Sequence, residues 1–302
     1  MSDPFEGLEP RSKEPNSGTN FLNWLAQAAT RQRIAPKRLN RLVANGIVIA
    51  ALQQALHDDG RSEFLVKGGT QIELRLGLRA RASADLDTLF RGEFTSFLDR
   101  LDDVLIEGLG PFSLQRSVPE EIDVPSRRVN PQRLIIKIEL RGKTVLSAQL
   151  EVAPDEAGAG QLVDMIKMPS LEHFGFSTPR VVAALSIEYQ VAQKLHACTD
   201  SHTAQRGNFR VHDVVDLHLL RIEYFSAGVT SRLRHACAAV FAARVEDAIA
   251  MGHEPRKWPP LVEVHEHWRK PYKRLASDLE LELTFDEAIT GLNQWIEEID
   301  GS

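Results

Sequence analysis

The chain has 302 residues, of which 43% are hydrophobic and 26% are charged, and its formal net charge is −6 at pH 7. These values are ordinary for a soluble globular protein, and the length suggests two domains. The negative balance argues against a protein that coats nucleic acid indiscriminately. The sequence has no apolar run of membrane-spanning length, and its first thirty residues have no apolar signal core, so we expect no membrane contact.

The N-terminal residues 1–19 are rich in Pro, Gly, Ser and charge, and we expect them to form a flexible tail. Apolar residues at helical spacing then predict one helix from Asn20 and a second over residues 36–60, with Pro36 near its start and Gly60 as its stop. This region also carries the first of three basic clusters, which are residues 30–41, 75–81 and 268–274. Such local clusters on an acidic chain can hold a polyanion at one site.

The middle of the chain alternates short strands and helices. The pattern predicts a strand at "EFLV" (63–66), a short helix at "TQIELRLG" (70–77), a strand at "DLDTLF" (85–90) and a helix over residues 94–109. Two β-rich runs, "RLIIKIEL" and "TVLSAQLEV", are separated by "RGK" and predict a hairpin over residues 133–152.

Helical periodicity dominates the C-terminal part of the sequence. The predicted helices cover residues 181–198, 210–225, 230–250, 259–276 and 285–299. We therefore expect an α+β chain with an α/β domain over residues 20–165 and a helical domain over residues 166–302. The two cysteines, Cys198 and Cys237, lie on predicted helices without the spacing of a disulfide framework, which favours the reducing cytoplasm.

A glycine pair lies between the first predicted strand and the following helix. Gly68 and Gly69 lack Cβ atoms, so their backbone amides can approach an anion closely, and the helix N-terminus adds partial positive charge. Thr70 adds a hydroxyl. A plain strand–helix turn has the same appearance, and the chain has no GxxxxGK[ST] phosphate loop.

Two acids follow on the next predicted strand. Asp85 and Asp87 are two residues apart, so both carboxylates point to one face of the strand. Two close carboxylates repel unless a cation lies between them, and Mg²⁺ prefers hard oxygen ligands, so we expect a metal site here. A third acid would complete the set: Glu151 projects from an apolar strand and is preferred, and Glu139 is the rival.

The ordered motifs resemble those of a known family. The glycine turn, the Asp-Leu-Asp strand and a third acid on a neighbouring strand resemble the polymerase-β-like nucleotidyltransferase fold, and "KGGT" with "RASADLD" is similar to the AbiEii/AbiGii nucleotidyltransferase toxins. The segments "VAQKLHAC" and "RGNFRVHDVVDL" are similar to later motifs of the family. Three positions depart from the family pattern: Gln193 replaces Glu, His212 replaces Lys, and Glu151 replaces Asp.

The resemblance assigns roles by position. It implies that Asp85, Asp87 and Glu151 bind Mg²⁺ and that Lys67, Gly68, Gly69, Thr70, Arg81 and Arg210 contact the nucleotide. Lys194 would contact phosphates as a catalytic residue, although a lysine at the edge of a buried stripe is often only a snorkelling side chain. Asp213 would orient Lys194 or Arg210, and a surface ion pair with Arg210 is the equal alternative. We expect a structural role for Asp216.

The resemblance also implies a function. It predicts a cytoplasmic, metal-dependent toxin that transfers nucleotides from NTP, with the tRNA 3′ end as the first expected acceptor, and that inhibits translation and growth. A cognate antitoxin, expected to be a winged-helix transcriptional regulator, would be its partner. The alternatives are transfer to a protein or small-molecule hydroxyl, such as that of an aminoglycoside, and a non-catalytic nucleotide-binding partner module.

Overall fold

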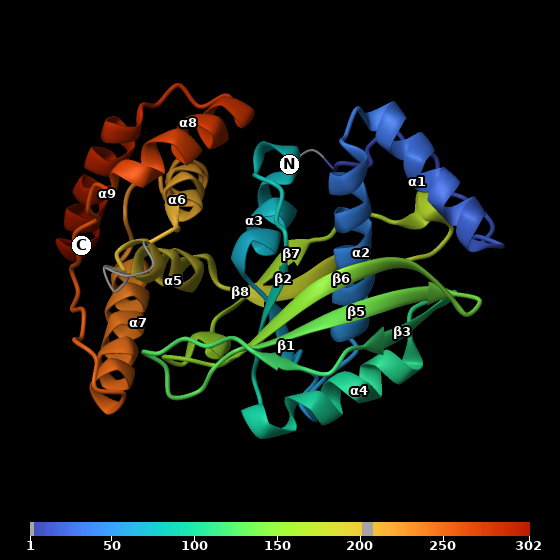
Figure 1. The fold of residues 1–302 in the computed structure, drawn as a ribbon, viewed down its shortest axis with the longest axis horizontal. Coiled ribbons are helices and arrows are strands. Elements are labelled where there is room, and N and C mark those ends of the chain that lie inside the picture. Colours follow the sequence, from blue (N-terminus) through green and yellow to red (C-terminus); the bar gives the residue numbers. More distant parts are fainter. Residues whose placement is uncertain (1–2, 201–207) are drawn as a thin grey trace.

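A mixed β-sheet forms the centre of the computed structural model, which describes residues 3–200 and 208–302 (Figure 1). The strand order is β3-β5-β6-β2-β1-β8-β7, and β4 pairs with β5 outside this path. The strands are β1 (Phe64–Val66), β2 (Leu86–Phe90), β3 (Phe112–Arg116), β4 (Glu120–Glu121), β5 (Gln132–Leu140), β6 (Lys143–Pro154), β7 (Val163–Lys167) and β8 (Val181–Leu185). An α+β fold with a mixed sheet and a helical C-terminal region confirms the predicted fold class.

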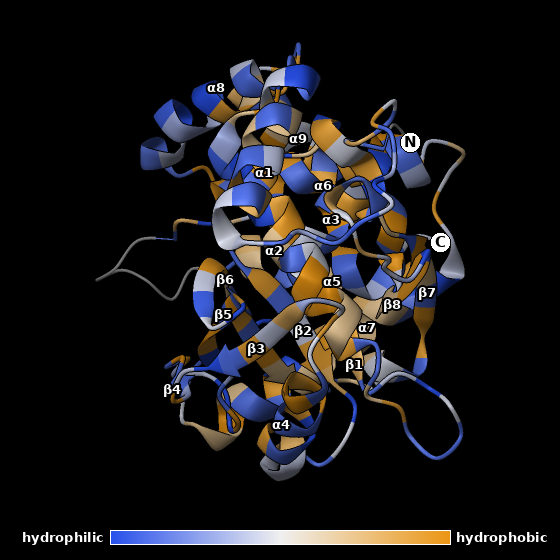
Figure 2. Ribbon diagram, turned by 90° about the vertical axis from the view of Figure 1, so that its right-hand side faces the viewer, coloured by the Kyte–Doolittle hydropathy of each residue, from blue (hydrophilic) through white to orange (hydrophobic). Residues whose placement is uncertain are grey.

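Helices cover both faces of this sheet. One face packs against α1 (Gly18–Gln32), α2 (Pro36–Leu52) and α4 (Phe97–Glu107). The second apolar cluster combines the other face with α3, α5, α6, α7, α8 and α9, whose bounds are Gly68–Leu76, Ile187–Cys198, Val211–Tyr224, Ser231–Ala250, Arg269–Asp278 and Phe285–Asp300. Figure 2 shows hydrophobic residues concentrated on the inner strands, while α1 and α8 are largely hydrophilic.

Strand alternation decides which side chains face the C-terminal helices. In β2, Leu86 and Phe90 belong to the cluster with α2, whereas Leu89 belongs to the cluster with α5 and α6. Because side chains two apart share a face, Asp87 projects to the same side as Leu89. The buried face of the strand therefore directs this carboxylate toward the C-terminal helices.

The structure corrects several predicted elements. Residues 181–185 are a strand rather than the start of a helix, and α5 begins only after Ser186, whose hydroxyl accepts a hydrogen bond from the Tyr189 amide. Their β-branched and apolar run fits a buried strand as well as a helix, so periodicity alone does not separate the two. Helix α2 ends at Leu52 instead of reaching Gly60, and the last-but-one helix begins at Arg269 rather than at residue 259.

The sheet also extends past the predicted domain boundary. Strand β8 pairs in parallel with β1, and β7 pairs with β8, so a boundary at residue 165 falls inside the sheet. The predicted tail contacts the core, because the Phe5 ring is buried against His173 and Phe174. Among the described residues, none of the helices combines the length and the apolar character that crossing a membrane requires.

Candidate active site

The turn between β1 and α3 packs directly against Asp87. Gly68 has a φ of +65°, and a Cβ built on it would lie 1.9 Å from Oδ2 of Asp87. The Lys67 amide donates to the Asp87 carbonyl oxygen at 3.0 Å, which ties the turn to β2. Only glycine fits at position 68, because any side chain would displace the carboxylate.

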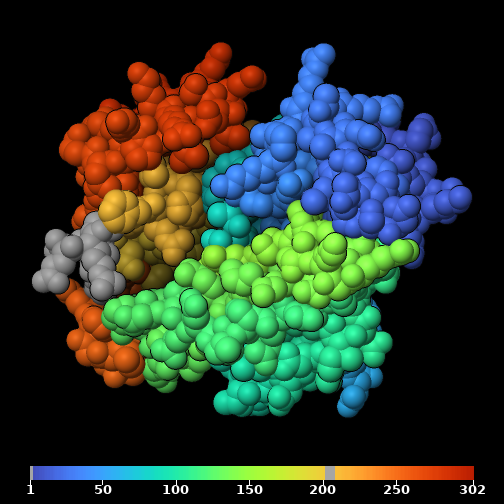
Figure 3. Space-filling model, turned by 45° about the vertical axis from the view of Figure 1, so that its right-hand side comes forward, coloured from blue at the N-terminus to red at the C-terminus, as the bar shows by residue number. Residues whose placement is uncertain are grey.

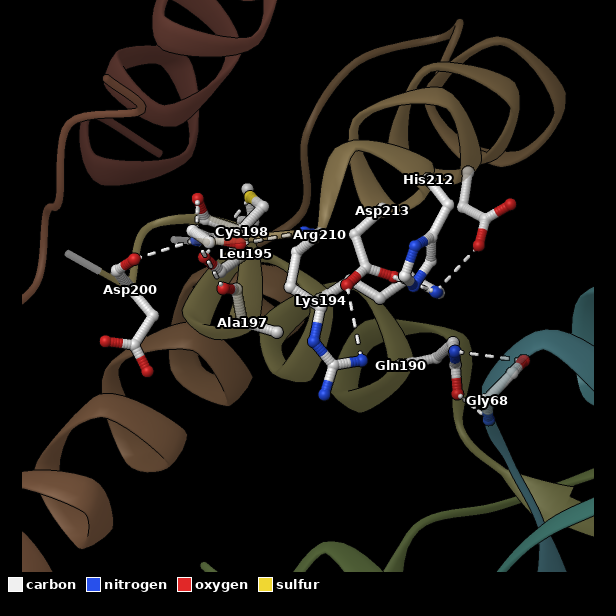
Figure 4. A network of polar contacts seen from close by, with 12 residues as sticks. Gly68, Gln190, Lys194, Leu195, Ala197, Cys198, Asp200, Arg210, His212 and Asp213 are labelled. Atoms are coloured by element: carbon white, nitrogen blue, oxygen red, sulfur yellow. Dashed lines mark hydrogen bonds and ion pairs between the residues drawn. The ribbon is translucent and has the colours of Figure 1, made fainter. Parts of the chain in front are cut away.

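Gln190, on α5, holds the backbone of this turn from the other side. Its Oε1 accepts from the Gly68 amide at 2.9 Å, and its Nε2 donates to the Gly68 carbonyl at 3.2 Å (Figure 4). The Gly68 amide therefore already has an acceptor in the Gln190 side chain and is not free to bind an anion. The amides of Gly69 and Thr70 belong to the first turn of α3, where backbone amides have no intrahelical acceptor, and Gly69 lines the cavity, where its amide can meet an anion.

The Thr70 side chain has a different position from the one expected of a phosphate ligand. Thr70 is buried, and its hydroxyl donates to the carbonyl oxygen of Asp85 at 2.7 Å. The Ser83 hydroxyl donates to the same carbonyl at 2.9 Å. Two hydroxyls thus fix the backbone at the start of β2 and orient the Asp85 side chain.

Three acids meet where β2 runs beside β6. Asp87 lies directly opposite Glu151 in the parallel register, and Gln149 donates from its Nε2 to Asp85 Oδ1 at 2.7 Å and to Glu151 Oε1 at 3.3 Å. The rival third acid, Glu139, lies near the hairpin end, where it pairs with Thr144 in the register. Of the two candidates, Glu151 is the acid that adjoins the Asp85 and Asp87 pair.

The acids have the donor chemistry of a divalent-cation site. Burial raises the pKa of Asp87 to about 6, and burial together with Glu151 raises the pKa of Asp85. A cation beside these carboxylates would relieve both shifts, and their oxygens are the ligands that Mg²⁺ prefers. Across residues 3–200 and 208–302, no group of three or more acidic, His or Cys side chains is already gathered tightly enough to hold a metal. Glu151 is paired with Arg133, whose Nη2 lies 2.8 Å from its Oε1.

A buried network of charges lies across the site from the acids. Lys194 Nζ donates to Asp213 Oδ1 at 2.5 Å and to Asp216 Oδ2 at 2.8 Å, and Arg81 donates to Asp216 at 2.9 Å. Burial alone would lower the pKa of Lys194, but the two carboxylates outweigh it and the net pKa is raised. The same pairing lowers the pKa of Asp213 to about 2 in spite of its burial. Lys194 and Asp213 are therefore both charged at neutral pH.

Two further side chains, Arg210 and His212, lie near Asp213. Arg210 Nη1 lies 3.9 Å from Asp213 Oδ2, and His212 Nε2 lies 3.6 Å from Asp213 Oδ1. The Arg210 side chain is largely exposed, and Figure 4 shows it extending away from the α6 backbone on the same side as Lys194. Desolvation lowers the pKa of His212, so this side chain is neutral at pH 7. The Asp213 carboxylate pairs mainly with Lys194, and Arg210 is a more distant partner.

The glycine turn, Asp87, Glu151 and the charge network open onto one cavity of about 550 Å³. Figure 3 shows the C-terminal half (gold to red) and the strands (green) meeting along a hollow. The predicted site residues that line the cavity are Lys67, Gly68, Gly69, Arg81, Asp87, Glu151, Lys194, Arg210 and Asp213. Thr70 and Asp85 lie behind this lining. The cavity is in the size range of small-molecule sites, and its lining combines carboxylates with cations.

A family model decides what kind of protein has this arrangement. The model of the AbiEii nucleotidyl transferase toxins of type IV toxin–antitoxin systems matches residues 50–290, which contain every site residue named above. The chain belongs to the AbiEii family. This membership makes it a nucleotidyltransferase of a toxin family, as the ordered motifs predict.

One solved structure shares the fold of this AbiEii protein, and a second is less similar. The nucleotidyltransferase toxin MenT4 from Mycobacterium tuberculosis is 17% identical with a TM-score of 0.50, over 94% of this chain and 98% of that one. An antigenic nucleotidyltransferase-like protein from Paracoccidioides brasiliensis is 15% identical with a TM-score of 0.37, over 71% and 94% of the two chains. No curated protein matches the sequence significantly.

The cavity of this AbiEii protein contains residues that the motifs do not reveal. Arg127 and Arg244 both line it and share Glu156, at 3.6 Å and 2.8 Å, and Gln193 donates to the same carboxylate at 2.9 Å. Gln193, the position where the family usually has Glu, thus completes a buried cluster around an acid from the loop after β6. Arg127 precedes β5 and Arg244 is on α7, so only the tertiary structure brings them together. Part of the "RGNFRVHDVVDL" motif, residues 206 and 207, lies outside the described residues.

Proposed function

We propose that the protein transfers nucleotides from NTP to the 3′ end of tRNA and thereby inhibits translation and growth. The observation that supports this proposal best is the position of Asp87, which is in register with Glu151 and in contact with the Gly68 turn, on the wall of a cavity that cations also line. Carboxylates beside a phosphate-sized turn suit phosphoryl transfer, in which positioning and charge neutralisation supply most of the rate.

In this proposal the triphosphate lies between the α3 N-terminus and the charge network. The Gly69 amide donates to it, and Lys67, Lys194, Arg81 and Arg210 supply positive charge. Lys194 reaches the cavity in a fixed orientation, because Asp213 and Asp216 hold its ammonium group. Asp213 therefore acts as a positioning residue, and Asp216 does the same for Arg81.

The 3′ hydroxyl of the acceptor attacks the α-phosphorus of the NTP. A bond forms between the 3′ oxygen and the α-phosphorus. The bond between the α-phosphorus and the oxygen that bridges it to the β-phosphorus breaks, and pyrophosphate leaves. Glu151 accepts the hydroxyl proton, since its carboxylate lies beside Asp87 at the cavity wall. Asp85, Asp87 and Glu151 would hold Mg²⁺, which when bound neutralises charge on the phosphates. Their oxygen-only donor set is the observation that favours this metal.

Membership of a type IV toxin–antitoxin family implies an antitoxin partner and an NTP substrate. We extend this to a winged-helix transcriptional regulator as the antitoxin, and to the cytoplasm as the compartment. Both buried cysteines are unpaired by disulfides in the described part of the chain, which agrees with a reducing location.

The decisive experiment incubates the protein with Mg²⁺ and each labelled NTP, with and without total tRNA. Label on tRNA in the wild type, absent from Asp87→Asn, supports the proposal. Label on a protein or on a small molecule would show that the acceptor is not tRNA. Absence of any transfer would favour a non-catalytic, nucleotide-binding partner module. Chelation of the metal should abolish transfer, and unchanged transfer in EDTA would contradict the role of Mg²⁺.

A further inference from the structure

A second hollow, of about 750 Å³, adjoins the nucleotide cavity between α2 and α8. Arg81 and His212 line both spaces, so the two hollows adjoin at these residues. The cationic lining of the second hollow is completed by Arg38, Lys270 and Arg274. We call this hollow the α2–α8 groove.

The groove collects one or more residues from each of the three basic clusters of the sequence. Arg38 comes from residues 30–41, Arg81 from residues 75–81, and Lys270 and Arg274 from residues 268–274. The chain as a whole has a net charge of −6, so four cations in one hollow are a strong local departure. Asp278 is the one acid among the described lining residues, and its carboxylate lies 4.0 Å from Arg274 Nε with both groups largely exposed. So weak a pair leaves most of the positive charge of Lys270 and Arg274 in place, whereas Arg38 and Arg81 are each paired with a buried acid, Glu73 and Asp216.

The cations are of two kinds, fixed and mobile. Arg38 is fixed, because its Nε donates to Glu73 at 2.8 Å and its Nη2 donates to the Ala80 carbonyl at 2.7 Å. Arg81 is fixed in the same way by Asp216. Lys270 and Arg274 are exposed and lie four residues apart, so they share one face of α8. Fixed guanidinium groups at the junction and mobile cations farther out suit a flexible chain of phosphates better than one compact anion.

The ends of the two helices support the same conclusion. Helix α2 begins "PKR" and α8 begins "RKP", and neither has an acid in its first turn or a side-chain N-cap among the described residues. Basic residues at a helix N-terminus add to the positive end of the helix dipole, an arrangement that an anion would stabilise. Two such termini border the same groove.

We propose that the α2–α8 groove binds the phosphate backbone of an RNA acceptor and leads its 3′ end past Arg81 to Asp87. This proposal rests on the proposed function, because it assumes that the acceptor is a polynucleotide. The apolar part of the lining, which includes Leu275, Leu279 and Val211, offers a surface to ribose and base faces. A nucleic acid fits this combination, whereas a small acceptor has no use for a charged groove outside the nucleotide cavity.

The test reverses the two mobile cations. Lys270→Glu/Arg274→Glu is compared with Lys137→Glu/Lys143→Glu, which changes the net charge equally at exposed positions on β5 and β6. The probe is a hairpin RNA with an unpaired 3′ end, measured by fluorescence anisotropy between 50 and 200 mM salt. Transfer to the same RNA and binding of NTP are measured alongside.

The groove variant should bind the RNA about tenfold or more weakly, and the slope of log affinity against log salt should fall by roughly 1.5–2 for two lost phosphate contacts. Its binding of NTP should be unchanged, and the KM for RNA should rise with little change in kcat. The control variant should behave as the wild type. Equal RNA binding by the groove variant and the wild type would overturn the proposal, as would an equal loss in the control.

Failure of the groove and failure of the proposed function are distinguishable. If the groove variant has the same KM for RNA as the wild type, the proposed role of the groove is refuted and the proposed function is unaffected. RNA binding that depends on the groove, without transfer from any NTP, supports the groove and overturns the function. If the wild type binds and labels only a protein, the RNA occupant is refuted.

Discussion

Replacing Gly68 by alanine tests the contact on which the site depends. A Cβ at this position would lie 1.9 Å from Asp87 Oδ2 and 2.5 Å from its Cγ, far inside van der Waals contact. The φ of +65° costs an alanine about 1–2 kcal/mol by itself. Relieving the clash costs about 1–3 kcal/mol more, as overpacking does elsewhere. We therefore expect Gly68→Ala to lower the free energy of unfolding by about 2–5 kcal/mol.

Gly158 provides a matched control. It has a φ of +67°, and a Cβ built there meets none of the described atoms within 4 Å. Gly158→Ala should therefore show the backbone cost alone, about 1–2 kcal/mol. The difference between the two variants measures the clash with Asp87, and urea denaturation of both provides it.

The same substitution should damage catalysis. Because the Asp87 carboxylate has to move by an ångström or more, nucleotide transfer should fall by about a hundredfold. Gly158→Ala should keep the wild-type rate. Transfer at the wild-type rate by Gly68→Ala, with the same stability as Gly158→Ala, would refute the packing of the glycine turn against the acid.

Three other variants follow from the charges and the buried histidine. Asp87→Asn removes a carboxylate whose pKa is raised by burial. The variant should therefore lose transfer and toxicity, while its free energy of unfolding rises by about 1–3 kcal/mol. Retained growth inhibition would contradict this prediction. Lys194→Met leaves the buried Asp213 and Asp216 without their shared cation, which should cost about 3–5 kcal/mol in urea denaturation and strongly reduce transfer; wild-type transfer would show that Lys194 only packs. Burial lowers the pKa of His173 to about 4. As the pH falls below 6.5, this histidine therefore takes up a proton in the unfolded chain before it does so in the folded one. The free energy of unfolding should fall by up to about 3 kcal/mol between pH 6.5 and 4. His173→Phe should remove this loss, and equal pH slopes of the unfolding free energy in both proteins would count against it.

Local patterns predict strand β2 of this protein well. The alternation around Asp85 and Asp87, with an apolar residue between them, defines a face without any tertiary information, and the paired register with Glu151 agrees with it. The hairpin of β5 and β6 is equally local, because its turn chemistry and both strands are contiguous in the sequence. Such features depend on periodicity, and periodicity is visible in a single chain.

Other parts of the site depend on contacts between distant segments. The hydrogen bonds between Gln190 and Gly68 join residues 122 positions apart, and no local pattern marks a glutamine on a buried helix as their partner. Glu156, Arg127 and Arg244 likewise meet only after α7 packs beside the loop that follows β6. Sequence reasoning assigns Asp216 a structural role, yet it shares Lys194 with Asp213, a relation that spacing along α6 alone does not reveal.

Strand β8 passes into α5 through a single residue, Ser186, so the sheet and the C-terminal helices are joined directly at this point. A fragment that ends at residue 165 would lack β8 and leave the edge of β1 unpaired. It would also lack Gln190, whose side-chain amide bonds to Gly68 in the glycine turn. Expressed separately, each half should therefore be insoluble or inert, and the intact chain should melt as one cooperative unit.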